Sequence, residues 1–282
     1  MNIRSCLAAV LFTCSCVQNP SASQEVKGAD KASIINPTGT NIGNRFLPPD
    51  GYRRSAVDGF GNYLRSLPLQ PHGHAVHLYD GTKKGNQAVH AAVVKMDVGS
   101  KDLQQCADAV MRLRAEYLYA TGEFDKISFN FTNGFPAAFS QWKKGYKIAV
   151  NGNNVSWVPS DNADGGYSSF RQYLNRVFMY AGTLSLSRQM KKIPYSELRP
   201  GDVLIQGGSP GHAIIVVDMA QNVRGEKVFL LAQSYMPAQE IHVLVNPGNE
   251  TISPWYSAAG IHTTIHTPEW NFTVGDLKRF IE

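Results

Sequence analysis

Residues 200–217 of this chain read PGDVLIQGGSPGHAIIVV, and the pattern of this stretch decides the fold class. One apolar run lies before a glycine-rich loop at 207–211 and one lies after it, and two similar runs follow further along the chain. The four runs cover residues 202–205, 212–218, 228–233 and 241–245. Short runs rich in β-branched residues and bounded by Gly, Pro and Asn are typical of strands. Because the connections are short, we expect a contiguous antiparallel sheet over Asp202–Val245, with His212 at the start of its second strand.

Helical patterns precede this predicted sheet. The strongest covers Asp102–Tyr119, where several apolar side chains share one face with Cys106. Asp102 can cap this helix together with Gln105, and Gly122 follows its end. Further helices are expected over residues 56–67 and 168–181, and further strands over 76–79, 89–96, 127–131 and 155–158. Helices followed by an antiparallel sheet predict an α+β fold, in which the helix that carries Cys106 packs on the sheet.

The composition predicts a folded protein with a sizeable core, because 43% of the residues are hydrophobic. The formal net charge is +5, and the basic residues form only short groups such as Lys83–Lys84 and Lys143–Lys144. A nucleic-acid-binding protein needs a basic patch or stripe, so we expect no nucleic-acid partner. No segment has the about 20 apolar residues that a membrane-spanning helix needs.

The amino terminus has the pattern of a bacterial secretory signal peptide. Arg4 provides a basic start, and a short apolar run and several small residues follow it. Residues 11–14 resemble a lipoprotein box, so we expect residues 1–16 to be a signal peptide of the lipoprotein type, with Cys14 or Cys16 as the lipidated residue. The other interpretation is an ordinary signal peptide that contains cysteines.

The residues after the signal predict a tethered domain. Residues 17–44 are polar and contain almost no large apolar residues, which is typical of a flexible tether. We expect a single α+β domain over residues 45–282. A lipid anchor would hold this domain at a membrane. The expected location is therefore the cell envelope, on the periplasmic or outer-membrane face.

Cys106 is the first candidate for chemistry. Apart from the lipidation candidates it is the only cysteine that remains after removal of the signal, so we expect no structural disulfide. Near the start of a helix, the macrodipole and free N–H groups stabilise a thiolate. A nucleophilic cysteine needs a general base and a group that orients the base. His212 is the candidate base, because it opens an apolar strand directly after the glycine loop, and Gln233 could fix its tautomer.

Each of these residues also has a structural interpretation. Cys106 lies on the apolar face of its helix, where a free cysteine is often a small buried hydrophobe. His212 can be a capped strand start. Ser234 and Asp218 are alternatives to Gln233 as the third residue.

The second half of the chain resembles the NlpC-type papain-fold cell-wall peptidases and related amidases. The resemblance rests on residues 200–205, 211–217 and 229–234, together with the helix that contains Cys106. It implies a papain-like core with additions at the amino terminus and in the middle. It also implies Cys106 as nucleophile, His212 as general base and Gln233 as the orienting residue. The chain departs from that family's pattern after Cys106, where Ala107-Asp108 replaces a Ser-Gly pair.

As a whole, the chain is similar to an uncharacterised lipoprotein family of gut Bacteroidetes, known as a domain of unknown function. The likeness lies in the segments QQCADA (104–109), RLRAEYL (112–118), GGSPGH (207–212) and QSYMPAQ (233–239). This resemblance implies a location in the envelope and names no reaction.

Two functions therefore compete. In the first, the protein is a papain-like cysteine hydrolase that cleaves an amide bond, with peptidoglycan or another envelope peptide as substrate and no cofactor. His212 would then hold Cys106 partly as thiolate near neutral pH. In the second, the protein is a non-catalytic envelope lipoprotein that uses the same fold to bind glycan or peptide. The aromatic residues considered for such binding are Trp142, Trp157, Trp255, Tyr256 and Trp270.

Three histidines lie close together at His72, His74 and His77. On a strand, His72 and His74 would share one face and His77 would point to the other. No neighbouring run completes a ligand set, so the sequence predicts a strand edge with solvated histidines and no metal site.

Overall fold

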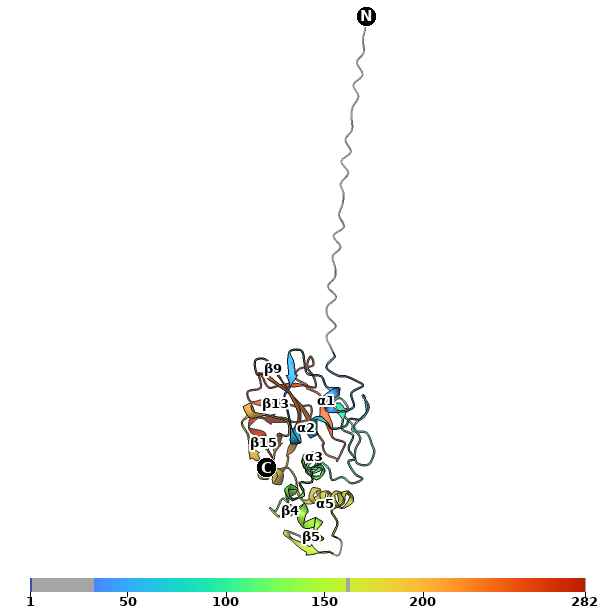
Figure 1. The fold of residues 1–282 in the computed structure, drawn as a ribbon, viewed down its shortest axis with the longest axis vertical. Coiled ribbons are helices and arrows are strands. Elements are labelled where there is room, and N and C mark those ends of the chain that lie inside the picture. The colour runs from blue at the N-terminus through green and yellow to red at the C-terminus, as the bar shows by residue number, and fades with distance from the viewer. Residues whose placement is uncertain (2–32, 161–162, 282) are drawn as a thin grey trace. The chain divides into compact units, whose positions relative to one another are not determined.

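The computed structural model describes residues 1, 33–160 and 163–281 (Figure 1). Ser33–Glu282 forms one compact unit. Residues 2–16 of the predicted signal peptide, with Cys14 and Cys16, and residues 17–32 of the predicted tether lie outside the described residues. Within the described residues, no helix has the length and the apolar character needed to cross a membrane.

One large antiparallel sheet forms the centre of the unit. Its strands are β1 (Tyr52–Arg54), β2 (His90–Val93), β7 (Lys191–Lys192), β8 (Val203–Gln206), β9 (His212–Asn222), β10 (Lys227–Gln233), β11 (His242–Leu244), β12 (Tyr256–Ser257) and β15 (Leu277–Arg279). The order is β2-β11-β10-β9-β8-β15-β7, while β1 also pairs with β9 and β12 with β10. Neighbours β8 to β11 follow one another in the chain and pair antiparallel, which confirms the predicted meander.

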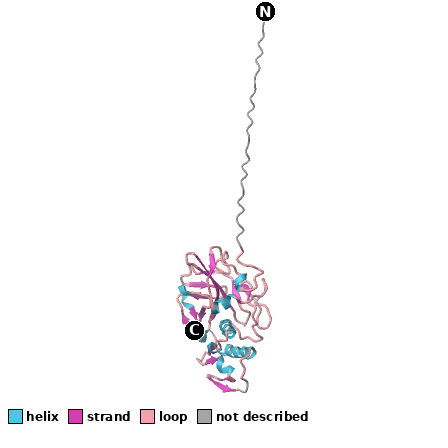
Figure 2. Ribbon diagram, viewed as in Figure 1, coloured by secondary structure: helices cyan, strands magenta, loops and turns pink. Residues whose placement is uncertain are grey.

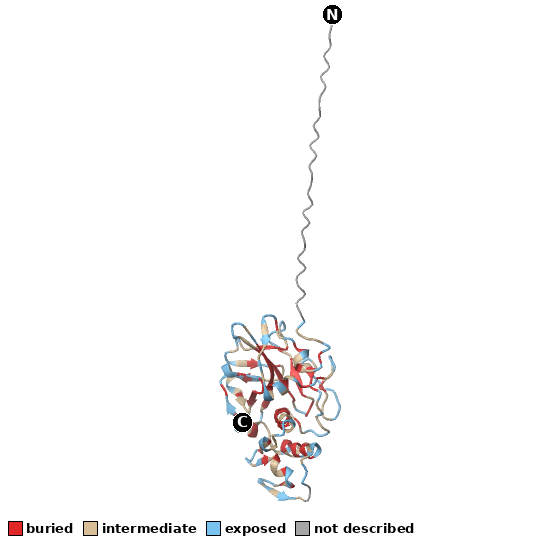
Figure 3. Ribbon diagram, in the orientation of Figure 1, coloured by how far each residue is buried: buried red, intermediate tan, exposed pale blue. Residues whose placement is uncertain are grey.

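Strand β9 is buried on both faces, which explains its continuous apolar run. Ala213, Ile215 and Val217 belong to one hydrophobic cluster. Ile214 and Val216 point to the other face and belong to a second cluster. Because side chains alternate along a strand, a strand between two cores must be apolar at every position. Figure 3 shows this burial along the central strands.

Helices cover part of the sheet and extend the first hydrophobic cluster (Figure 2). They are α1 (Ile42–Arg45), α2 (Gly59–Arg65), α3 (Cys106–Ala120), α4 (Phe139–Lys143), α5 (Tyr167–Tyr180) and α6 (Thr183–Gln189), with short 3-10 turns η1 (Phe124–Lys126), η2 (Tyr195–Glu197) and η3 (Val274–Asp276). Helix α3 packs on β9, as predicted. It also contacts α5, where the rings of Tyr119 and Phe170 stack at 4.4 Å.

Three two-stranded hairpins complete the unit. They are β3 (Ser128–Asn130) with β4 (Pro136–Ala138), β5 (Tyr146–Asn151) with β6 (Asn154–Pro159), and β13 (Thr264–His266) with β14 (Asn271–Thr273). Strands β3 and β6 and helix α5 lie where the sequence predicts them. The result is a mixed α+β fold with a large antiparallel sheet and few helices.

The main helix begins later than the sequence predicts. Gln105 is the N-cap of α3, and it forms a capping box with Asp108. Asp102 lies outside the helix, because its carboxylate accepts hydrogen bonds from the backbone N–H of Ala238 at 2.7 Å and from the side chain of Gln105 at 3.1 Å. Cys106 is therefore the first residue of α3 and not a residue of its second turn.

The domain begins earlier than the predicted boundary at residue 45. Residues 33–44 belong to the compact unit, so the tether does not extend to residue 44. Ile42 is fully buried, and the guanidinium of Arg45 donates to the carbonyl of Gly39 at 2.9 Å. The composition misled the prediction because backbone and polar side-chain bonds, rather than a run of apolar residues, hold this segment.

The predicted strand at residues 76–79 is also wrong. His77 and Leu78 form only isolated bridges, to Lys83 and Gln239. The backbone of Leu78 turns back toward Thr82, and Gly81 adopts a φ of 85° in that turn. Asp80 and Gly81 therefore close a tight turn instead of joining two strands of the sheet.

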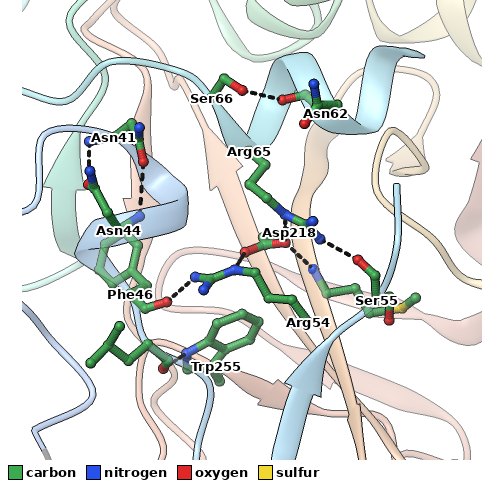
Figure 4. A network of polar contacts seen from close by, with 12 residues as sticks. Asn41, Asn44, Phe46, Arg54, Ser55, Asn62, Arg65, Ser66, Asp218 and Trp255 are labelled. Atoms are coloured by element: carbon green, nitrogen blue, oxygen red, sulfur yellow. Dashed lines mark hydrogen bonds and ion pairs between the residues drawn. The ribbon is translucent and has the colours of Figure 1, made fainter. Parts of the chain in front are cut away.

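A buried carboxylate fastens the early part of the domain to β9 (Figure 4). Asp218 is fully buried and forms ion pairs with Arg54 at 2.8 Å and Arg65 at 2.7 Å. Arg54 belongs to β1 and Arg65 to α2, so one carboxylate connects three elements. Its location and partners exclude Asp218 as the residue that orients His212.

Candidate active site

Cys106 lies at the amino end of α3, where the backbone N–H groups have no helical partner. The side chain of Gln105 accepts from the backbone of Asp108, and the carboxylate of Asp108 accepts from the backbone of Gln105 at 3.1 Å. This capping box fixes the helix start and therefore the direction of the sulfur. The cysteine is free and 7% exposed.

His212 is the first residue of β9 and lies directly after the glycine loop. Gly211 must lack a side chain, because a Cβ there would approach the carbonyl oxygen of Gly208 and the hydroxyl of Thr183, each to 2.5 Å. The imidazole is buried among aromatic rings, with centroid distances of 4.9 Å to Tyr235 and 5.4 Å to Trp270. The loop therefore delivers His212 into an enclosed, aromatic environment.

Cys106 and His212 line the same cavity, whose volume is about 540 Å³. Tyr235, Trp270 and Thr183 also line it. The backbone of Ala213, the residue after His212, lowers the pKa of the Cys106 thiol in part. A cavity of this size lies within the range that holds a small ligand or a peptide side chain. The structure thus brings together the two residues that the sequence selected from segments far apart in the chain.

Gln233 is bonded to His212, as expected for the third residue. It ends β10, and its Oε1 lies 2.9 Å from Nε2 of His212. An amide oxygen only accepts, so Nε2 of His212 carries the proton. In the neutral ring Nδ1 is then free to accept a proton, which is the state that a general base requires.

The orientation of the Gln233 amide is itself fixed by two acceptors. Its Nε2 donates to Oε2 of Glu269 at 2.7 Å and to Nε2 of His242 at 3.3 Å. His242 can accept there because its Nδ1 donates to the carbonyl oxygen of Glu240 at 2.9 Å. The other oxygen of Glu269 forms an ion pair with Lys84 at 2.7 Å. A continuous polar chain therefore runs from Lys84 to His212 and determines the tautomer of the candidate base.

Burial controls the protonation of both candidate residues. It raises the pKa of the Cys106 thiol, which the backbone N–H of Ala213 lowers in part. It lowers the pKa of His212 to about 4, against the smaller effects of Gln233 and Glu269. The resting pair at neutral pH is therefore a thiol and a neutral imidazole. The expectation of a partial thiolate was wrong, because desolvation outweighs the helix start.

Asp108 is a member of the cavity that the sequence did not suggest. It is buried, and this burial raises the pKa of its carboxyl well above the ordinary value. Its Oδ1 has no hydrogen-bond partner among the described residues. A protonated carboxyl at this position can donate a hydrogen bond into the cavity.

The remaining candidates have structural roles. Ser234 donates to the carbonyl oxygens of Gln239 at 2.8 Å and Gln104 at 3.1 Å, which joins β10 to the segment before α3. Of the five aromatic residues considered for binding, Trp270 lines the cavity. Trp142, Trp255 and Tyr256 are buried in the core.

His242, Glu269 and Lys84 were missed by the sequence analysis. His242 could have been found, because it faces Gln233 across the β10–β11 hairpin and the sequence predicts both strands. Glu269 and Lys84 lie in segments without a strand or helix, so only the tertiary fold places them here.

Comparison with known proteins gives one family. The model of the family described as domain of unknown function (4846) matches residues 42–279. No curated protein matches the chain, and no solved structure matches it.

Proposed function

This chain belongs to the family described as domain of unknown function (4846), and we propose that it is a cysteine hydrolase of the papain-like class that cleaves an amide bond. The observation that carries the proposal is the fixed tautomer of His212. Its Nε2 donates to Gln233, so Nδ1 is free to take a proton inside the cavity that Cys106 also lines. Cys106 is the nucleophile, His212 the general base and Gln233 the positioning residue.

The reaction starts from the neutral pair. Nδ1 of His212 takes the proton from the thiol of Cys106 while the sulfur attacks the carbonyl carbon of the amide. The imidazolium that forms is stabilised by Gln233, whose oxygen accepts from Nε2. Because a neutral thiol is a poor nucleophile, transfer of its proton to the base during attack is essential to this mechanism.

The negative charge on the carbonyl oxygen needs donors close to the sulfur. Cys106 and Ala107 are the first two residues of α3, so their backbone N–H groups have no partner within the helix and lie beside the sulfur-bearing residue. Donors placed where charge develops stabilise the tetrahedral intermediate. The imidazolium then gives its proton to the leaving nitrogen, the C–N bond breaks, and a thioester remains on Cys106. Water hydrolyses the thioester with His212 again as base, which releases the acid and restores the thiol.

The proposed substrate is a peptide of the cell wall or another envelope peptide. The amino-terminal pattern supports export, and residues 1–16 supply the proposed lipoprotein signal.

The proposed membrane contact is a lipid on Cys14 or Cys16. Incorporation of labelled palmitate into the full chain, and its loss in Cys14→Ser or Cys16→Ser, tests this anchor. Unchanged incorporation in both single variants and in the double variant would contradict it.

Hydrolysis is tested with soluble cell-wall peptides and mass spectrometry. The full chain should generate a new carboxylate and a new amine from one amide bond, and Cys106→Ser should generate neither. Thr121→Ser is the matched control for an equally small change on the same helix, at its C-cap. Alkylation of Cys106 that occurs only after denaturation would refute the proposal, because such a sulfur does not reach a substrate carbonyl.

A second candidate function is binding without catalysis. The observation that favours it is the protonation of the pair, since burial raises the pKa of Cys106 and lowers that of His212. Tyr235 and Trp270 would then supply the contacts to a glycan or peptide in the cavity. Saturable binding of a cell-wall peptide that is equal in wild type and Cys106→Ser, with no product, distinguishes this function from hydrolysis.

A further inference from the structure

A second cluster of titratable side chains lies outside the candidate active site. His74, His77 and Glu240 each offer one donor atom, and the three atoms all lie within 4.8 Å of one another. Oε2 of Glu240 is 3.5 Å from Nε2 of His74 and 3.2 Å from Nδ1 of His77. None of the three residues is among the described residues that line the Cys106 cavity.

The cluster is held in place by its own backbone. The N–H of His77 donates to Oε2 of Glu240 at 2.9 Å, and the N–H of Glu240 donates to the carbonyl oxygen of His77 at 2.9 Å. The carbonyl oxygen of His74 lies 3.0 Å from Nε2 of His90, which fixes the other end of the loop. The backbone of His77 therefore aligns segment 74–77 against Glu240. Nδ1 of His77 also lies at hydrogen-bond distance, 3.2 Å, from Oε2 of Glu240.

One of the donors has no hydrogen-bond partner. Nε2 of His74 is buried and unbonded among the described residues, because its 3.5 Å approach to Glu240 lacks the geometry of a hydrogen bond. A buried nitrogen without a partner is costly unless another group occupies its lone pair. Both imidazoles face the same carboxylate oxygen, which gives two nitrogen donors and one oxygen donor around one point.

We propose that His74, His77 and Glu240 bind a divalent transition-metal ion, with zinc as the best fit. Donors about 2.05 Å from a shared tetrahedral ion lie about 3.3 Å from one another. The two separations of 3.5 and 3.2 Å agree with such an edge. Two imidazoles and one carboxylate suit zinc and its neighbours in the first transition row better than calcium or magnesium. Three protein ligands leave the fourth position to water or to a bound molecule.

The site would connect two segments far apart in the chain. His74 and His77 lie in the loop before β2, while Glu240 lies just before β11. The ion would thus cross-link this loop to the edge of the meander. Because metal that binds only the folded state shifts the equilibrium toward it, zinc should raise the unfolding temperature.

The test uses the full chain with Cys6, Cys14, Cys16 and Cys106 all replaced by serine, so that no thiol competes for the metal. Isothermal titration with Zn²⁺ should give one equivalent per chain. His74→Ala, His77→Ala and Glu240→Gln should each weaken binding by about tenfold or more, since loss of even a supporting contact to a ligand costs about 10–100-fold. His72→Ala is the matched control, because His72 is exposed and lies outside the cluster.

Circular dichroism and the unfolding temperature of each variant without metal show whether it folds. Glu240→Gln keeps the size of the side chain, so it tests the carboxylate even where a histidine variant is destabilised. Cobalt absorption in the visible range gives a second measurement of nitrogen and oxygen ligation. The proposal would be overturned if the protein did not bind zinc. It would also be overturned if Glu240→Gln and His77→Ala bound zinc as strongly as the protein that keeps both ligands. The measurement contains no hydrolysis step, so its failure would leave the cysteine hydrolase untouched.

Discussion

The substitution His212→Gln tests whether the imidazole takes the proton of Cys106. Glutamine removes the titrating group and can still bond to Gln233. With a pKa of about 4, His212 is almost entirely neutral and available as a base at neutral pH. Burial raises the pKa of the Cys106 thiol above its ordinary value. Even a free thiol has a pKa of about 8.5, so at about pH 6 fewer than about one Cys106 thiol in 300 is ionised without help.

The expected size of the effect on the alkylation rate follows from the contribution of a general base, which is about 10²–10⁴-fold. His212→Gln should therefore slow alkylation of Cys106 by iodoacetamide by about 100-fold at about pH 6. The wild-type rate should fall only as His212 becomes protonated near pH 4. Near about pH 9 the two proteins should converge, because spontaneous ionisation then supplies the thiolate.

The assay is the rate of alkylation measured by intact mass spectrometry between about pH 4 and about pH 9, a range that spans the ordinary histidine and cysteine pKa values. The chain carries serine at Cys6, Cys14 and Cys16, so that the label reports on Cys106. His262→Gln is the matched control, because His262 is exposed and belongs to neither candidate site. Rates that rise about tenfold for each pH unit in wild type, and coincide with those of His212→Gln, would refute the role of His212 as base.

Three further predictions concern the polar chain behind His212, the buried carboxylate of Asp218 and the dependence of stability on pH. The double substitution Glu269→Met and Lys84→Met removes the ion pair without leaving a buried charge. It should lower the alkylation rate of Cys106 at about pH 6 by about tenfold, with a small change in unfolding temperature. An unchanged pH profile of alkylation would show that Gln233 needs no support from this ion pair. Asp218→Asn leaves Arg54 and Arg65 without their carboxylate, so the free energy of unfolding in urea should fall by about 3–5 kcal/mol, whereas the exposed control Asp50→Asn should change it little. Burial lowers the pKa of His212 to about 4 in the folded protein, whereas the same imidazole in the unfolded chain has the ordinary pKa of about 6.5. Between these two values the unfolded chain binds more protons, so the stability of the fold should decrease as the pH falls from about 6.5 to about 4. By about pH 4.5 the free energy of unfolding, measured in urea titrations, should have fallen by about 2–3 kcal/mol because of His212, and this fall should be absent in His212→Gln. An equal fall in both proteins would assign it to other groups.

The sheet could be predicted from the sequence because its signals are local. Each strand of the meander is a short apolar run with turn residues at both ends, and Ala213–Val217 of β9 are all apolar because this part of the strand lies between two clusters. The start of α3 could not be placed correctly by the same means. Asp102 has the composition of a helix cap, but its carboxylate bonds to Ala238, which lies more than a hundred residues away. A local pattern does not show that Asp102 has a distant partner while Gln105, three residues later, caps the helix.

In the candidate site too, some properties could be predicted from the sequence and others could not. His212 and Gln233 lie at the ends of predicted strands and Cys106 near the start of a predicted helix, so the sequence could select them. The fold brings them to one place. Their protonation could not be predicted, because it depends on burial. The position of Cys106 at a helix start favours a thiolate, whereas the enclosure around its sulfur has the larger effect and raises the pKa. The proposed mechanism therefore depends on proton transfer during attack and not on a preformed ion pair.

Glu240 contributes to both candidate sites through different atoms. Its carbonyl oxygen accepts from Nδ1 of His242, which lets His242 accept from Gln233 and so supports the orientation of His212. Its carboxylate faces His74 and His77 and has no part in that chain. A change of the side chain alone, as in Glu240→Gln, keeps the carbonyl and should leave the alkylation profile of Cys106 unchanged. Loss of zinc binding together with an unchanged profile would show that the two sites share a backbone segment while their chemistry is independent.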